Sequence, residues 1–291
     1  MKENSLPNDD PEILYHYCSN AAFCSIIQNK SIWLSSLSQS NDSMEGRWLR
    51  SIFQQACFDS AVKDRHVPDI MQSFDHLIEM SDSLGFCLSE QSDLLSQWRG
   101  YADDAAGVCI GFSFPYLKRG RRADEENNAS GYSLQKVIYG TQEQPEYLKE
   151  VIKHVEGFSS KGAYDRPTLM TLAKTNEEQE TQKKLRTSAS FPILLLICDL
   201  FKVKNPAFSE EREWRLMSIS PRNISNSCKY RSAGSKIIPY REFPLERMDE
   251  FPIVEIVLGP KNTSNEKDIA NLLLANEFEN VVVKRSAATY R

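Results

Sequence analysis

Two glutamates and an arginine alternate within residues 208–216, FSEEREWRL. Alternate side chains of a β-strand share one face, so Glu211, Glu213 and Arg215 should point the same way. Of two carboxylates at the entrance of a strand, one can stabilise a developing oxocarbenium ion and the other can orient or deprotonate a nucleophile. The row is equally compatible with a solvated face or with structural salt bridges, so it predicts a candidate site with those alternatives open.

Ring-bearing residues supply a second set of candidates. His16 lies in an otherwise apolar segment, ILYHY, where it is either a core histidine satisfied by hydrogen bonds or a ligand-binding group. Trp98 and Tyr101 are three residues apart and share one face of a predicted helical turn. Such a pair either packs in a core or forms an aromatic shelf for a planar ring.

A polar turn, SNDSME at residues 40–45, precedes a predicted helix. Asn41 or Asp42 followed by Glu45 is typical of a capped helix start. Glu45 could also face a pocket. If Asp42 and Glu45 approached Glu211 and Glu213, the four carboxylates could hold Mg²⁺, which is the arrangement of a metal-dependent nuclease.

Several established site motifs are absent from the sequence. It contains no GxxxxGK[ST], GxGxxG, GxSxG or HExxH pattern, and its four histidines are scattered. A phosphate-binding P-loop, a serine-hydrolase elbow and a zinc-protease helix are therefore excluded. Because a zinc site needs clustered ligands, we expect no resident metal.

Composition limits the partners that the chain can take. The 291 residues carry a net charge of -5, which disfavours general electrostatic binding of nucleic acid. The longest apolar run, residues 191–198, is much shorter than the ~20 residues that span a bilayer, so we expect no membrane association. The first 12 residues are too polar for a signal peptide. Seven cysteines without a CxxC pair predict reduced, buried thiols and a cytoplasmic location.

Periodicity predicts one α+β domain after a polar lead at residues 1–12. We expect a short helix between Ser19 and Lys30, a helical insertion at about 144–200, and a central β-structure that contains residues 13–17, 107–114 and 211–219. Further strands are predicted at 31–35, 84–89, 135–139, 237–240, 251–258 and 281–284. Further helices are predicted at 44–61, 68–80, 94–101 and 266–275.

These segments, in this order, resemble the bacterial family of unknown function DUF2971. The resemblance rests on the YHY strand, the WLS strand, the NDxxE turn, WxxYA with GVCIGF at 107–112, and EREWR at 211–215. LGP at 258–260 and SAATYR at 286–291 also fit. It covers most of residues 13–291 except the insertion. The family name implies no activity.

The opening order of a histidine-bearing strand, a short helix and a second strand is similar to the start of ADP-ribosyltransferase-like domains. That resemblance implies a central β-structure of this type and NAD as co-substrate. It implies that His16 binds the NAD ribose and that Glu213 aligns the nicotinamide ribose for attack. Glu211 would be the first glutamate of Glu-x-Glu. Ser89 or Tyr101 would fill the middle position, although the central strand lacks the Ser-Thr-Ser of that pattern.

The resulting hypothesis is an NAD-cleaving enzyme, either an ADP-ribosyltransferase or an NAD glycohydrolase, that belongs to a bacterial defence or toxin system. It would transfer ADP-ribose to an unknown macromolecular acceptor or to water. Glu213 and Glu211 would be catalytic. His16, Tyr101, Trp98 and Arg215 would bind the co-substrate. The alternatives are a non-enzymatic ligand-sensing or partner-binding module and, second, the nuclease. A cleft of about 20 Å or less lined by His16 and Glu213 favours NAD, whereas carboxylates converging within about 2–2.5 Å of one point favour the nuclease.

Overall fold

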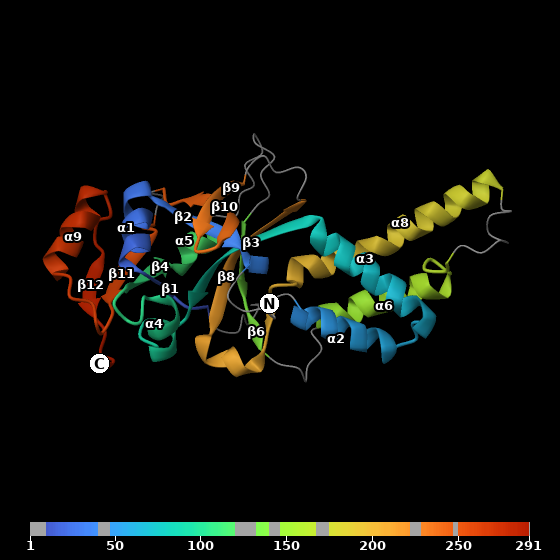
Figure 1. The fold of residues 1–291 in the computed structure, drawn as a ribbon, viewed down its shortest axis with the longest axis horizontal. Coiled ribbons are helices and arrows are strands. Elements are labelled where there is room, and N and C mark those ends of the chain that lie inside the picture. Colours follow the sequence, from blue (N-terminus) through green and yellow to red (C-terminus); the bar gives the residue numbers. More distant parts are fainter. Residues whose placement is uncertain are drawn as a thin grey trace, which may run out of the picture.

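Strands gather in one half of the molecule, and four long helices extend from the other half (Figure 1). The computed structural model describes residues 10–39, 47–119, 132–139, 146–166, 175–221, 228–246 and 250–290. The combination of a mixed sheet with segregated helices confirms the α+β prediction. Among these residues, no helix has the length and apolar character needed to cross a membrane.

The described strands form a ten-stranded sheet and a separate two-stranded ribbon. The path of the sheet is β12 (Val282–Arg285), β11 (Ile253–Leu258), β4 (Val108–Ser113), β1 (Ile13–Cys18), β3 (Ser81–Ser89), β2 (Ser31–Ser36), β10 (Lys236–Pro244) and β9 (Lys229–Ala233). Off this path, β8 (Glu213–Pro221) pairs with β3 and with β5 (Tyr132–Lys136). β6 (Ile138–Tyr139) and β7 (Val203–Lys204) form the ribbon.

Strand β3 is the branch point of the sheet, because three strands pair with it. β8 pairs along its full length. On the other edge β2 reaches only Leu84 and Gly85, and β1 reaches only Ser89. β1 and β2 therefore separate beside residues 86–88, and the sheet is split at this place.

The helices cover both faces of the sheet. α1 (Asn20–Asn29), α5 (Phe114–Arg119) and α9 (Glu266–Ala275) share one apolar core with the strands. A second core joins α2 (Arg47–Phe58), α3 (Val67–Glu79), α6 (Glu146–Ser160) and α8 (Asn176–Asp199) to the sheet. Along β8, Trp214 and Leu216 face the first core and Met217 faces the second. This alternation is the strand period that the sequence predicted.

The predicted central β-structure is confirmed, because β1, β4 and β8 belong to one sheet. The entry to β8 differs from the prediction. β8 begins at Glu213 rather than at Glu211, because residues 206–211 form the 3-10 helix η3 (Pro206–Glu211) and Arg212 is left-handed with φ of 42°. Helices α6 and α8, from the predicted insertion, pack with α2 and α3.

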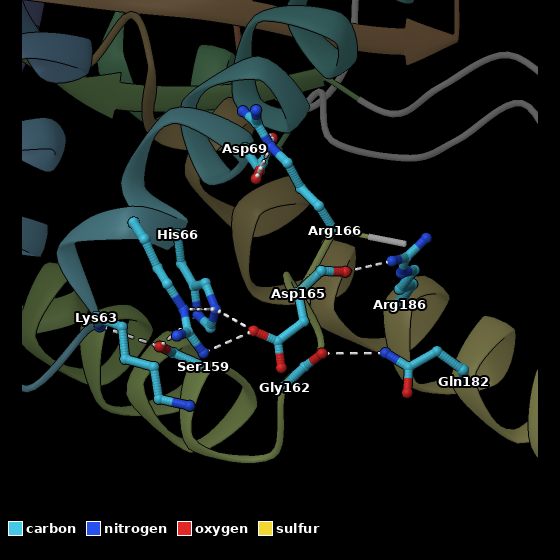
Figure 2. Close-up of polar contacts among 10 residues, drawn as sticks. Lys63, His66, Asp69, Ser159, Gly162, Asp165, Arg166, Gln182 and Arg186 are labelled. Carbon is cyan, nitrogen blue, oxygen red and sulfur yellow. Dashed lines mark hydrogen bonds and ion pairs between the residues drawn. The ribbon is translucent and has the colours of Figure 1, made fainter. Parts of the chain in front are cut away.

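A partly buried polar network fixes the end of α6 against the 3-10 turn η2 (Asp64–His66), as Figure 2 shows. His66 Nε2 donates to Asp165 Oδ1 at 2.8 Å, and His66 Nδ1 lies 2.9 Å from Ser159 Oγ. Ser159 Oγ also accepts the amide of Lys63 and has no solvent exposure. A nucleophile must reach its substrate, so this Ser–His–Asp arrangement is a structural network rather than a catalytic triad.

The C-terminal segment closes over the short helix α4 (Leu95–Tyr101). The carboxylate of Asp93 accepts hydrogen bonds from Trp98 Nε1 at 2.6 Å and from the amide of Ala287 at 2.7 Å. Ser286 Oγ and the amide of Ala288 add two more donors to the same carboxylate. Residues far apart in the sequence thereby hold α4 in one orientation against β1.

Gly107 should be essential for the turn between α4 and β4. A Cβ atom there would lie 2.1 Å from the carbonyl oxygen of Cys18 and 2.9 Å from that of Ala102. We expect Gly107→Ala to lower the free energy of unfolding by about 1–3 kcal/mol in urea titrations, which is typical of overpacking. Gly100→Ala is the control: its Cβ meets nothing within 4 Å, so stability should stay the same or rise. Equal unfolding midpoints for Gly107→Ala and wild type would contradict this expectation.

Candidate functional site

A cavity of about 410 Å³ opens beside the split in the sheet. Its volume is in the range of small-molecule sites. The walls come from β1, β2, β3, β8, β9 and β10, and from α4, β7, η3 and the 3-10 turn η1 (Leu37–Gln39). Lining residues with polar or reactive groups are Tyr15, His16, Tyr17, Ser35, Ser36, Cys87, Ser89, Gln97, Tyr101, Lys204, Glu211, Glu213 and Arg231.

A buried network of charges forms one wall of this cavity. Lys204 Nζ donates to Glu211 Oε2 at 2.6 Å and to Glu213 Oε2 at 2.9 Å. Arg215 donates through Nε to Glu213 Oε1 at 2.7 Å and through Nη2 to Glu213 Oε2 at 3.0 Å. Both oxygens of Glu213 are therefore occupied. In the described part of the chain, Glu211 Oε1 has no hydrogen-bond partner.

Local backbone geometry places the two carboxylates. Asn205 caps η3 by accepting the amide of Ala207, and the left-handed Arg212 then reverses the chain into β8. Ser89 Oγ donates to the carbonyl of Glu211 at 2.7 Å, and the amide of Glu213 donates to Tyr139 Oη at 2.9 Å. Glu211 thus approaches the cavity from a helix end, whereas Glu213 is the first residue of a strand.

Burial and pairing move the pKa values of the two glutamates in opposite directions. Burial alone would raise the pKa of Glu213, but Arg215 and Lys204 outweigh it and lower that pKa to about 2. Burial raises the pKa of Glu211, and Lys204 only partly offsets this effect. The pKa of Lys204 is raised because both glutamates outweigh its own burial. Glu213 is therefore a fixed anion, and Glu211 is the more easily protonated of the pair.

His16 lies where β1 and β2 separate. Its ring stacks on Phe86 with centroids 4.0 Å apart, and Nδ1 lies 2.8 Å from the carbonyl oxygen of Cys87. A carbonyl can only accept, so Nδ1 carries the proton and Nε2 retains its lone pair. Burial lowers the pKa of His16 to about 4, so the ring is neutral near pH 7. His16 is thus a half-buried lining residue that is satisfied by its hydrogen bond to Cys87 and keeps one nitrogen able to accept.

The two aromatic candidates of α4 have different environments. Tyr101 lines the cavity with 48% of its surface exposed. Burial and the nearby charge of Glu211 raise its pKa to about 12, so it stays protonated. Trp98 is fully buried and packs edge-on against Tyr17, with ring centroids 4.8 Å apart. Only Tyr101 is therefore placed to contact a ligand ring.

The structure brings four of the six predicted site residues together at one cavity: His16, Tyr101, Glu211 and Glu213. Trp98 and Arg215 are buried outside its lining. The interpretation of the Glu–Glu–Arg row as a solvated face is wrong, because all three side chains are buried. Ser89, the alternative to Tyr101 in the middle position, also lines the cavity.

Lys204, Arg231 and Cys87 line the cavity, although the sequence did not indicate a role for them. Lys204 and Arg231 lie in short segments without a motif. Cys87 was predicted to be buried by its apolar neighbours, but it is exposed because its side chain alternates with the buried Phe86 and Leu88. The six described cysteines form no disulfide.

The residues of the nuclease alternative are only partly described. Asn41, Asp42 and Glu45 lie outside the described residues. Within the part of the chain that the structure describes, no cluster of three histidine, cysteine, aspartate or glutamate side chains could hold a metal ion. The ammonium of Lys204 lies between Glu211 and Glu213, where a metal shared by these two carboxylates would have to bind.

Replacing Lys204 by methionine should remove a positive charge that pairs with two buried carboxylates, those of Glu211 and Glu213. We expect Lys204→Met to lower the free energy of unfolding at pH 7 by about 3–5 kcal/mol. Because Glu213 has a folded-state pKa of about 2, below its ordinary 4.5, its pairing stabilises the fold above pH 4.5 and is lost as pH falls toward 2. In Lys204→Met this acid loss should start at a higher pH. Urea titrations between pH 2.5 and 7 measure both effects, with Lys236→Met on exposed β10 as control.

Cys87 should be the fastest-reacting cysteine of the native protein. Burial raises the pKa of Cys18 and of Cys57 to about 12, and that of Cys109 well above its usual value. Their thiolates are therefore scarce near pH 8. Alkylation with iodoacetamide, followed by peptide mass analysis, should label Cys87 first. If Cys87→Ser retained the fastest phase, the assignment would be wrong.

Comparisons with known proteins match part of the chain to one family. The model of the family described as "Protein of unknown function (DUF2971)" matches residues 97–216, which run from Gln97 on α4 through Lys204, Glu211 and Glu213. No curated protein and no solved structure matches the chain. The similarity to ADP-ribosyltransferase-like domains therefore stays a hypothesis. The match includes three of the motifs that carried the resemblance, WxxYA, GVCIGF and EREWR, and so supports the similarity to this family over residues 97–216.

Proposed function

We propose that the chain binds NAD in this cavity and cleaves its nicotinamide–ribose bond, transferring ADP-ribose to water or to a macromolecular acceptor. One observation carries the proposal: His16, Tyr101, Glu211 and Glu213, from segments up to about 200 residues apart, line one cavity. Tyr15, next to His16, pairs with Ser89, which pairs with Glu213. At about 4.8 Å per strand, the Tyr15 and Glu213 backbones lie about 10 Å apart.

The charges of the site suit a reaction that develops positive charge. When the bond between C1′ and the ring nitrogen breaks, the electron pair leaves with neutral nicotinamide and C1′ becomes cationic. Glu211, with Oε1 unoccupied and its carboxylate at the cavity wall, is the group placed to stabilise that cation. An oxygen of water or of the acceptor then bonds to C1′ and releases its proton to solvent.

This geometry revises the roles proposed for the two glutamates. The resemblance assigned the nicotinamide ribose to Glu213, but Lys204 and Arg215 occupy both oxygens of that residue. We therefore assign the ribose contact to Glu211, and Glu213 holds Lys204 in place. His16 Nε2 would accept a ribose hydroxyl, and the exposed ring of Tyr101 would contact nicotinamide.

The non-enzymatic alternative has one observation in its favour. The pairing of Glu213 with Lys204 and Arg215 is complete without any ligand, as expected of a structural ion pair. In that function the cavity binds a ligand without changing it. Wild-type protein that binds NAD but releases no nicotinamide, with any lysate as acceptor source, would favour this alternative.

A cytoplasmic location is part of the proposal. The exposed Cys87 and the lack of disulfides among the described cysteines support a reducing compartment. NAD is an intracellular metabolite, so the proposed substrate is consistent with the same compartment.

We expect Glu211→Gln to lower nicotinamide release by about 10²–10³-fold, because glutamine keeps the size of the side chain but removes the charge that opposes the cation. Glu210→Gln, an exposed neighbour on the same 3-10 helix, is the matched control and should keep wild-type activity. Nicotinamide release and label transfer from NAD measure the effect, with circular dichroism as the control for folding. Because the pKa of Glu211 is raised above its ordinary 4.5, the activity of wild type should begin to fall before a decreasing pH reaches 4.5. Full activity of Glu211→Gln would overturn this assignment.

A further inference from the structure

Arg231 brings a positive charge to the cavity that the described residues do not neutralise. It lies on β9, and its side chain reaches past β10 to β2, where Nη2 donates to Ser35 Oγ at 3.2 Å. Its Nε is buried and has no hydrogen-bond partner. No carboxylate of the described residues forms an ion pair with it, in contrast to Lys204 and Arg215, which both pair with glutamates.

An unpaired guanidinium is costly in a partly desolvated place. A buried N–H without an acceptor loses its hydration and gains nothing in return. A charge without a partner adds a larger penalty. Arg231 therefore has the properties of a group whose partner is an anion supplied from outside the protein.

The surroundings of Arg231 favour a phosphate as that anion. Ser35 and Ser36 both line the cavity, and the hydroxyl group of Ser35 contacts the guanidinium. Ser36 Oγ also lies 2.9 Å from Ser38 Oγ on η1. A phosphate group can accept several donors at once, and arginine binds it with two parallel N–H groups.

The distance across the cavity indicates what the phosphate is attached to. The guanidinium lies over β2, and β2 is separated from β8 by β3 alone. Ser35 pairs with Gly85 and Gly85 pairs with Met217, four residues from Glu213. About 10 Å across the strands and about 13 Å along β8 therefore separate the backbones of Ser35 and Glu213, roughly 16 Å in all. Side chains that line the cavity from both ends take up part of this span, and the phosphate, ribose and base of a nucleotide would bridge the rest.

We propose that Arg231, with Ser35, binds the 5′-phosphate of a nucleotide whose ribose and base extend toward Glu211 and Tyr101. This inference rests on the proposed function, in which the nucleotide is the nicotinamide half of NAD. The cavity then has two separate subsites: a cationic subsite for the phosphate, and an anionic subsite for the ribose carbon that becomes charged.

The test compares ligands that differ only in the phosphate. Isothermal titration of wild-type protein should show nicotinamide mononucleotide binding at least 10-fold more tightly than nicotinamide riboside. Arg231→Gln should weaken binding of the mononucleotide by about 10–100-fold and leave that of the riboside unchanged. Lys229→Gln removes the same charge two residues away on β9, from a lysine that pairs with Glu242 outside the cavity, and should change neither.

Binding measurements with ribose 5-phosphate and ribose distinguish a failure of this inference from a failure of the proposed function. Binding of ribose 5-phosphate that Arg231→Gln abolishes, in a protein that releases no nicotinamide from NAD, would support the phosphate subsite and overturn the proposed reaction. If wild type and Arg231→Gln both cleave NAD and bind it with equal affinity, the result would support the reaction and overturn the phosphate subsite. Equal binding of phosphorylated and unphosphorylated ligands by wild type would also overturn it.

Discussion

One ammonium group between two buried carboxylates determines the geometry of the cavity wall. Lys204 comes from β7, Glu211 from the end of η3, and Glu213 from the start of β8, so its two hydrogen bonds fix three segments relative to one another. Buried ions need good geometry and further hydrogen bonds to offset their desolvation, and Arg215 supplies those bonds to Glu213. The network holds one carboxylate fully paired and leaves Oε1 of the other without a partner among the described residues.

The split in the sheet creates the space that this network borders. Where β1 and β2 separate, the carbonyl of Cys87 faces the gap, and the ring of His16 supplies the hydrogen bond that a neighbouring strand would otherwise provide. Buried carbonyl groups need such partners, so the carbonyl of Cys87 is not left unsatisfied at the cavity. The same residue lines the cavity, so its structural role is compatible with the ligand contact proposed for it.

Much of the fold follows from local sequence patterns. The boundaries of α1 and α9 and the alternation along β8 agree with the periodicity of the chain. The entry to β8 was misplaced because Pro206 and the left-handed Arg212 override the alternation that residues 211–215 share with a strand. Strand β9 was missed because its exposed residues, KYRSA, lack an apolar face.

The candidate site was only partly predictable. His16 and the glutamates belong to recognisable motifs, and their meeting at one cavity follows from strand pairing over long distances in the sequence. Lys204 and Arg231 belong to no local sequence pattern. Lys204 stands out because the tertiary structure pairs it with Glu211, and Arg231 stands out because its buried Nε has no hydrogen-bond partner. Trp98 and Tyr101 share a helix face in sequence, yet the closure of residues 286–290 over Asp93 leaves only Tyr101 exposed.

The branch at β3 also affects how the protein is made. β3 ends at residue 89, yet its long edge is covered by β8, whose residues start at 213, and β2 is covered by β10 from residue 236. During synthesis on a ribosome, these edges stay open while more than a hundred intervening residues emerge. Pairings so distant in sequence close slowly. The nascent chain therefore carries exposed strand edges until late in translation, and the cavity forms only after β10 has left the ribosome.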